Sequence, residues 1–449
     1  MTPLARILIA VLAIAMLASA CTSTSSPNPN PKPSDGAEPS TGVPSSPEVV
    51  PEPEDGPGSA LAALERLCTI VPPDLEGGSE VPAEGPTPPA IAKVMGELEQ
   101  IRGFDFSANV VAEPVTQQDI AEGYREYIET YYPEEFYARR SLAWQTIGVI
   151  PQGTNIRDEL LEYGSTQVIG YYDTVTGELV FLGQEDPTPL ERVTLAHELT
   201  HAIDDQRFGL EKVDVLGAEC REEELQATLG LVEGNATFFM LRWAQTFLTV
   251  EQQIELSAEA AAQQPPPSEI PPFIDAMQQW PYTAGLRFIT ALEVDGGLEA
   301  VDAAFLDMPV SSEQILHPER YPNDVPTPVD VPDLASELGS GWEDLDVQPI
   351  GEIWLDVALG LRLDGLDASE ASAGWDGGIY RAWSDGERVA IVLATTWDSE
   401  RDAEEFAAGM ERWITAGETP AEVLTPDGTS VRVLFATDPG TLADLRSAA

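Results

Sequence analysis

Residues 195–208 read LAHELTHAIDDQRF, and this stretch decides how the rest of the chain is interpreted. Apolar residues recur around it at helical spacing and predict a helix over 188–208. Residues four apart in a helix lie on one face, so His197 and His201 project together, about one turn apart. Two imidazoles placed in this way can bind a single Zn²⁺ ion.

Glu198 follows the first of these histidines and is expected to lie beside the metal. A carboxylate in that position can take a proton from metal-bound water and later pass it to a leaving amine. The pattern His-Glu-x-x-His on a helix is the one that zinc peptidases use. Because the chain contains three histidines in all, chance would seldom produce this spacing.

A peptidase zinc ion needs a third protein ligand and an open position for water. The downstream candidates are the acids Glu222, Glu223, Glu224 and Glu233. The first three form a charged run that water can solvate, whereas Glu233 lies in an apolar stretch where a lone carboxylate is costly unless it is neutralised. Glu233 is the predicted ligand. Glu224 is the alternative, because its spacing from His201 is nearer to that of thermolysin-like enzymes.

Small residues around Glu233 also predict how its helix packs. Gly230, Gly234 and Ala236 flank the carboxylate and would let this helix approach the histidine helix closely.

The stretch 195–208, followed by LVEGNA at 231–236, resembles a family of secreted, largely uncharacterised bacterial gluzincin-type metallopeptidases. Members of that family show HELxHAxxDQxF and then LVEGxA. The resemblance extends from about residue 101 to residue 321, with weaker matches at 170–173 and 312–318.

This resemblance implies a zincin-like peptidase domain in which zinc is bound by His197, His201 and Glu233, with Glu198 as the base. The chain departs from the family at Arg207, where a histidine is common. It also departs at Asn235, where an aspartate is common. If that position contacts a ligating histidine, Asn235 accepts a hydrogen bond but supplies no charge, which would lower the metal affinity.

Four further residues are candidates for supporting roles. Asp205, four residues after His201, could accept the free ring N–H of a ligand, or could be a solvated acid at the helix end. His317 could donate a hydrogen bond to the charge that develops on the substrate oxygen, and Tyr282 could do so through its hydroxyl. The alternatives are a histidine in a turn and a packed aromatic ring. Asn235 is the fourth candidate.

The N-terminus predicts export. Arg6 precedes an apolar run over 7–20 that is shorter than the roughly 20 residues a spanning helix needs. The run ends LASAC, which resembles a bacterial lipobox with Cys21 as the lipidated residue. The alternative is an ordinary secretory signal. We therefore expect a lipoprotein signal peptide at 1–20, a disordered Pro/Ser/Thr-rich tether at 21–58, and an extracytoplasmic, lipid-anchored protein that is secreted if Cys21 is not lipidated.

Composition narrows the partners. The chain has 77 acidic and 23 basic residues, a net charge of -54, which excludes nucleic acid as a partner and leaves peptides or proteins as the expected substrates. Cys68 and Cys220 form an even pair in an oxidising compartment and predict a disulfide, with two buried thiols as the alternative.

The expected fold class is α+β. Residues 59–335 should form a mainly helical zincin-like domain, with helices over 91–101, 119–143, 221–249 and 273–306 and a β-hairpin formed by 168–172 and 178–182. The strand 178–182 is expected, by analogy with zinc peptidases, to be an edge strand that pairs with substrate. Residues 336–449 should form a small α+β accessory domain without a catalytic constellation, serving as a scaffold or docking unit.

The leading hypothesis is a membrane-tethered zinc-dependent peptidase. The alternative is a non-catalytic lipoprotein that uses a degenerate zincin fold as a surface binding module. A purely structural zinc is disfavoured, because closed structural sites use four protein ligands.

Overall fold

The computed structural model describes residues 7–11, 58–70, 87–174, 176–184, 186–262 and 269–449. Cys21 and the rest of the predicted tether up to residue 57 lie outside these residues. No helix in the described part of the chain is long and apolar enough to cross a membrane.

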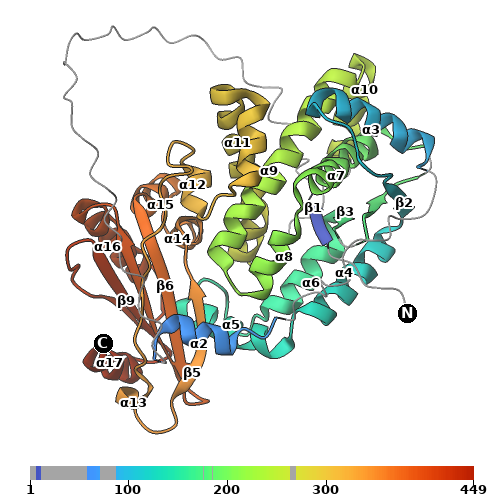
Figure 1. Ribbon diagram of the computed structural model, residues 1–449. Coiled ribbons are helices and arrows are strands. Elements are labelled where there is room, and N and C mark those ends of the chain that lie inside the picture. Colours follow the sequence, from blue (N-terminus) through green and yellow to red (C-terminus); the bar gives the residue numbers. More distant parts are fainter. Residues whose placement is uncertain (1–6, 12–57, 71–86, 175, 185, 263–268) are drawn as a thin grey trace, which may run out of the picture.

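The predicted α+β class is confirmed, with two separate sheets among many helices (Figure 1). The first part of the chain is mainly helical. Its helices are α2 (Ala60–Leu67), α3 (Pro89–Arg102), α4 (Gln117–Tyr131), α5 (Glu134–Ile147), α6 (Ile156–Gln167), α7 (Pro189–Phe208), α8 (Glu211–Ala218), α9 (Glu222–Phe247), α10 (Val250–Ala262), α11 (Pro272–Leu306) and α12 (Ser312–Leu316).

A small sheet lies under the helix that carries the two histidines. Its strands run in the order β1 (Ile7–Val11), β3 (Val168–Asp173), β4 (Glu178–Leu182) and β2 (Val111–Val115). The predicted hairpin is confirmed: β3 and β4 pair antiparallel. The prediction that β4 is an edge strand is wrong, because β2 pairs with its other side. β1 comes from the predicted signal peptide and pairs antiparallel with β3.

Local sequence signals define both ends of α7. Thr188 and Glu191 form a capping box at its start, Pro189 occupies the first turn, and the helix ends at Gly209, which has a positive φ. The helices predicted over 188–208 and 221–249 are confirmed as α7 and α9.

The glycines of α9 do not serve the contact that the sequence predicted. A Cβ at Gly234 would lie 2.2 Å from the backbone carbon of Gly285, so these glycines let α9 pack backbone to backbone against α11 rather than against α7. Gly230 takes part in the same contact, since a Cβ on Gly285 would lie 2.0 Å from the Gly230 carbonyl oxygen. The pattern predicted a close approach correctly but assigned it to the wrong helix.

The single helix predicted over 119–143 is also wrong. Pro133 lacks a backbone N–H and restricts the residue before it, so α4 ends at Tyr131 and α5 begins at Glu134. This break gives α4 and α5 separate directions, and side chains from both helices line the cavity described below.

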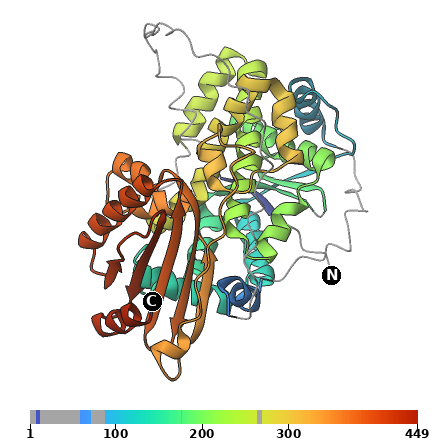
Figure 2. The same ribbon diagram turned by 60° about the vertical axis from the view of Figure 1, so that its left-hand side comes forward.

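The second sheet belongs to the C-terminal part of the chain, and Figure 2 shows its long strands from the side, in orange and red. Its antiparallel strands run in the order β5, β6, β7, β9 and β8, and β6 and β7 form a hairpin that turns at Asp385 and Gly386. The elements are α13 (Ala335–Leu338), β5 (Glu343–Pro349), α14 (Glu352–Gly360), α15 (Gly365–Ser372), β6 (Trp375–Ser384), β7 (Val389–Trp397), α16 (Glu400–Thr415), β8 (Ala421–Val423), β9 (Ser430–Ala436) and α17 (Pro439–Ala448).

The two parts share structure across the predicted boundary at residue 335. Helix α2, which the sequence assigned to the first domain, lies beside β5 (Figure 1), and Arg66 of α2 forms an ion pair with Asp344 at 2.5 Å. Cys68, just after α2, is joined by a disulfide to Cys220, just before α9. One apolar core also continues between the parts, where the rings of Phe273 and Trp354 meet at 5.2 Å.

Candidate metal centre

Three buried side chains converge between α7 and α9. The Nε2 atoms of His197 and His201 lie 3.1 Å apart, and Glu233 Oε2 lies 3.1 Å from the first and 3.4 Å from the second. Each residue is almost fully buried. These are the two histidines and the carboxylate that the sequence singled out.

The spacing of these atoms fits a metal ion. Ligand nitrogen and oxygen atoms bind zinc at about 2.0–2.2 Å, so two ligands of a tetrahedral site lie roughly 3.4 Å apart. If neither of the two facing Nε2 atoms carries a proton, they cannot hydrogen-bond to each other, but both can direct a lone pair at one cation. The donor set of two imidazoles and one carboxylate therefore suits zinc, and a fourth position would be left for water.

The charges at this centre favour the metal-binding forms. Burial lowers the pKa of His197, and a neutral imidazole is the form that ligates metal. Burial alone would raise the pKa of Glu233, but the neighbouring His201 and His197 outweigh it and hold that pKa at about 2. The third ligand is thus ionised over the whole physiological range.

Glu198 is fully buried beside the triad and faces the sheet. Neither of its carboxylate oxygens makes a hydrogen bond within the described residues, although the Tyr172 amide of β3 is near enough to lower its pKa. Burial and then the charge of Glu233 dominate, and they raise the pKa of Glu198 well above its ordinary value. A Cβ at Gly170 of β3 would lie 3.4 Å from Glu198 Oε1, so β3 forms the other wall of this space. Such an unsatisfied buried carboxyl is suited to exchange a proton with a bound water.

A second layer of polar residues supports α7, and the sequence identified only part of it. Asp204 accepts hydrogen bonds from Arg102 Nε at 2.8 Å and from Asn235 Nδ2 at 2.5 Å, and all three residues are buried. His201 lies close enough to lower the pKa of Asp204, although burial raises that pKa overall. Asn235 thus donates to an acid next to the candidate ligands, and the expectation that it accepts a hydrogen bond from a histidine is wrong, because its Oδ1 has no partner among the described residues.

The prediction that Asp205 supports a ligating histidine is wrong, and the adjacent Asp204 is the acid that lies near His201. Asp205 accepts a hydrogen bond from the Tyr172 hydroxyl at 3.0 Å and from the Leu210 amide at 2.9 Å, away from the histidines. Asp204 follows His201 by three residues, which also places it on the metal-facing side of the helix. The i+3 spacing was the signal that could have identified it. Arg102 gave no such signal.

Tyr282 and His317 lie in different places. The Tyr282 ring, on α11, stacks beside His197 with a centroid distance of 6.0 Å, so this residue borders the centre. His317 lies at the junction with the C-terminal part, where its Nε2 is 2.9 Å from Glu352 Oε1. That bond raises the pKa of His317 and gives the imidazole a different partner from the predicted substrate oxygen.

The acids at the start of α9 are not simply solvated, as the sequence suggested. Glu222 forms an ion pair with Arg140 at 2.9 Å, and the buried Glu223 accepts hydrogen bonds from the Ser312 amide and hydroxyl. Glu224, the alternative ligand, is paired with Arg221. None of the three joins the histidine pair in the described structure.

Another acidic group, formed by Glu313, Asp324 and Asp398, has a different character. Arg320 lies among these carboxylates, at 3.0 Å from Glu313, 2.7 Å from Asp324 and 2.5 Å from Asp398. The guanidinium already supplies the positive charge that a metal would bring, so this group is an ion-pair network.

A cavity of about 300 Å³ opens beside the metal centre. Glu233 and Tyr282 line it, together with other side chains of α4, α5, α6, α8, α9 and α11 and side chains of β5 and α14 of the C-terminal part. Glu233 of the candidate centre therefore lines a cavity that both parts of the chain build, whereas His197, His201 and Glu198 are not among its lining residues.

Comparison with known proteins matches only the C-terminal part. A family model described as a domain of unknown function (DUF8575) matches residues 343–446, which begin with β5 and end in α17. No curated protein and no solved structure matches the chain.

Proposed function

We propose that this chain is a zinc-dependent peptidase of zincin-like fold. One observation carries the proposal: two imidazoles and a buried carboxylate, from two helices, meet at the ligand-to-ligand distances of a tetrahedral zinc site. Glu198, buried and without a hydrogen-bond partner among the described residues, stands beside them.

In this proposal His197, His201 and Glu233 hold the ion. A zinc ion held there would polarise the substrate carbonyl and lower the pKa of a bound water. Glu198 accepts the proton of the attacking water and returns it to the leaving amine nitrogen. Its burial beside the three candidate ligands, without a hydrogen-bond partner among the described residues, suits it to both steps. The layer formed by Asp204, Arg102 and Asn235 fixes α7 against α9 and so keeps the ligands in register.

The open fourth position distinguishes this proposal from a structural zinc. Closed structural sites use four protein ligands, whereas the described residues bring three together here. The centre also borders a cavity rather than a sealed core.

Peptide-library cleavage, with and without a chelator, tests the proposal. The wild-type protein should cleave peptides, and the chelator should abolish cleavage until zinc is restored. The Glu198→Gln variant should retain about one zinc per chain yet lose activity by about 10³-fold, because only the proton-transferring group has been removed. Unchanged turnover in this variant would contradict the mechanism.

A non-catalytic binding module is the alternative. The same cavity that would hold a substrate side chain could hold part of a partner, and metal analysis separates the two readings in part. About one zinc per chain favours the enzyme, and none favours the binder. We further propose that the protein is exported and anchored through a lipid on Cys21, which intact-mass analysis of membrane-extracted protein would detect.

A further inference from the structure

The cavity beside the metal centre has a marked chemical character. Six of its lining residues are tyrosines. Five of these lie on α4, just after the end of α4, or on α5. The rings of Tyr127 and Tyr132 meet at 5.5 Å, those of Tyr132 and Tyr137 at 5.6 Å, and the hydroxyls of Tyr127 and Tyr132 lie 3.2 Å apart. These rings form one continuous aromatic wall.

Helix α9 also lines the cavity and carries the candidate metal ligand Glu233. Helix α9 presents Glu222, Gln226, Leu229 and Glu233 toward the cavity, at spacings that place them along one face of the helix. Leu229 therefore lies one turn before the metal ligand Glu233. A group bound against Leu229 would therefore lie about one helical turn from Glu233.

The C-terminal part supplies a third wall. Ile353 and Trp354 of α14 line the cavity, and Trp354 also packs on Phe273 of α11. The Ile353 amide donates to the Ser312 hydroxyl, which in turn donates to Glu223, so hydrogen bonds hold this wall against α9. The matched domain of unknown function thus forms part of the cavity itself rather than a separate docking unit.

The charges around the cavity disfavour an acidic ligand. Among the described lining residues Arg140 is the basic one, and it is already paired with Glu222 at 2.9 Å and with Asp346 at 2.6 Å. Asp214, Glu222, Glu223 and Glu233 place carboxylates around the same space. An uncharged apolar group gains from the aromatic wall, whereas a carboxylate would lose its hydration among other acids.

We propose that this cavity binds a large uncharged side chain of the peptide substrate, aromatic or long aliphatic, next to the bond that is cut, and that the C-terminal part forms one wall of this specificity pocket. The inference rests on the proposed peptidase function. The volume of the cavity is at the lower end of the range for ligand pockets and suits one such side chain with its adjoining peptide.

Binding of small probes to the full zinc-loaded Glu198→Gln chain tests this inference without relying on turnover. N-acetyl-phenylalanine amide and N-acetyl-glutamate amide are titrated, and binding is followed by calorimetry and by tryptophan fluorescence, since Trp144 and Trp354 line the cavity. The phenylalanine probe should bind at least about tenfold more tightly than the glutamate probe. Equal affinity for the two probes would overturn the proposal.

Variants locate the binding. Leu229→Glu should weaken the phenylalanine probe by about tenfold or more, and Ile353→Ala by about fivefold, because each removes apolar contact from the cavity. Leu142→Glu is the matched control, since Leu142 is 46% exposed and does not line the cavity, and it should change nothing. If Leu229→Glu does not fold, Leu229→Ala should enlarge the pocket and shift preference from phenylalanine toward tryptophan amide.

Two results separate this inference from the proposed function. Suppose that the phenylalanine probe binds, that its binding depends on Leu229, and that the chain cleaves no peptide. This result would contradict the peptidase proposal but would support the proposed pocket. Cleavage of peptides without preference for large apolar residues, unchanged in Leu229→Glu, would retain the peptidase and contradict the pocket.

Discussion

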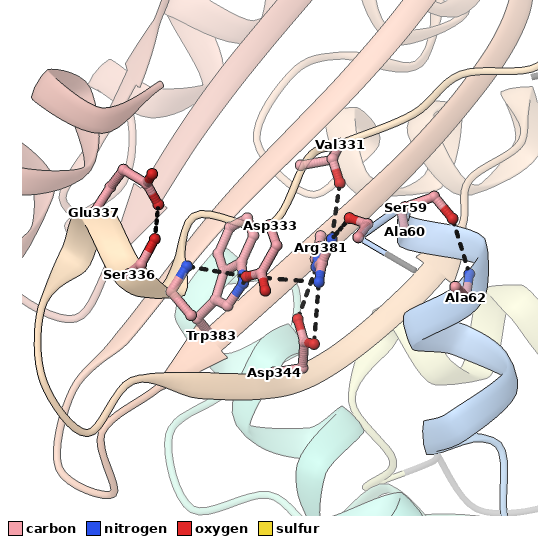
Figure 3. A network of polar contacts seen from close by, with 12 residues as sticks. Ser59, Ala60, Ala62, Val331, Asp333, Ser336, Glu337, Asp344, Arg381 and Trp383 are labelled. Atoms are coloured by element: carbon pink, nitrogen blue, oxygen red, sulfur yellow. Dashed lines mark hydrogen bonds and ion pairs between the residues drawn. The ribbon is translucent and has the colours of Figure 1, made fainter. Parts of the chain in front are cut away.

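Two buried polar clusters in this molecule differ in whether the protein completes them. In the first, the guanidinium of Arg381 on β6 donates to both oxygens of Asp344 at 2.7 and 3.0 Å and to the carbonyls of Gly58 and Val331 (Figure 3). This cluster joins β5, β6 and the chain just before α2. In the second, the candidate metal centre, two imidazole nitrogens face each other and Glu198 has no hydrogen-bond partner within the described residues.

The difference sets a cluster that the fold completes by itself apart from a cluster that lacks a partner. Buried polar groups normally find partners within the fold, because an unsatisfied group costs free energy. The Arg381 cluster follows that rule, and its residues stabilise the contact between α2 and the C-terminal sheet. The candidate metal centre would follow the rule if it held a cation and a water. Burial alone is therefore no guide to function, whereas two facing imidazoles beside an unpartnered carboxyl group make this cluster a candidate site.

The largest expected effect on folding is in the closed cluster. Arg381→Leu leaves the Asp344 carboxylate buried without its main counter-charge and should lower the free energy of unfolding by about 3–5 kcal/mol. Zinc content of the folded fraction should not change. Denaturant unfolding measures the loss, and Arg401→Leu is the control, since Arg401 is 80% exposed and its pair with Glu405 is worth less than about 1 kcal/mol. Equal effects of the two variants would contradict the assignment.

A smaller effect is expected beside the metal centre. Asn235→Asp restores the residue common in the resembling family but places a second carboxylate where the Asn235 amide now donates to Asp204 at 2.5 Å. One of the two acids must then bind a proton, so the variant should be about 2–3 kcal/mol less stable than wild type at pH 8 and less affected at pH 5. Thermal unfolding at the two pH values measures the stability difference between the variant and wild type. A difference that is the same at both pH values would contradict the contact between Asn235 and Asp204.

The smallest effect concerns the junction between the two parts. Burial raises the pKa of Glu223 to about 7, above its unfolded value, so its contribution to stability is present at low pH and is lost as the pH rises through 7. Glu223→Gln keeps an acceptor for Ser312 and should be about 1–2 kcal/mol more stable than wild type at pH 8, with no gain at pH 4. Glu224→Gln, at an exposed ion pair, is the control. A gain that does not vary with pH would contradict the shift.

The sequence predicted features that depend on residues close together in the chain, and it missed contacts between residues far apart in the chain. The histidine helix, the hairpin before it and the ligand Glu233 rest on local periodicity, capping and the cost of a charge among apolar neighbours, and the structure brings these residues together. Arg102 could not be identified, because its partner Asp204 is 102 residues away and no local pattern relates them. The role of α14 as a cavity wall likewise depends on tertiary packing.

Two errors show where local patterns are ambiguous. The small residues of α9 predicted a close helix contact, but a pattern on one helix does not identify its partner, and Gly285 of α11 lies against them. Asp204 and Asp205 are adjacent, and helical spacing of three or four residues allowed either to lie near His201. The structure selects Asp204 because only that side of α7 faces Arg102 and Asn235.

Zinc stoichiometry and affinity in three forms of the chain test the central claim most directly. Metal analysis and competitive chelator titration are applied to wild type, to Glu233→Gln and to Glu224→Gln, which removes the alternative ligand. We expect about one zinc per chain in wild type and in Glu224→Gln, and an affinity lower by at least about 100-fold in Glu233→Gln, since a direct ligand contributes more than an outer contact. A wild-type chain that binds no zinc, or a Glu233→Gln chain that binds it as tightly as wild type, would contradict the assignment of this centre.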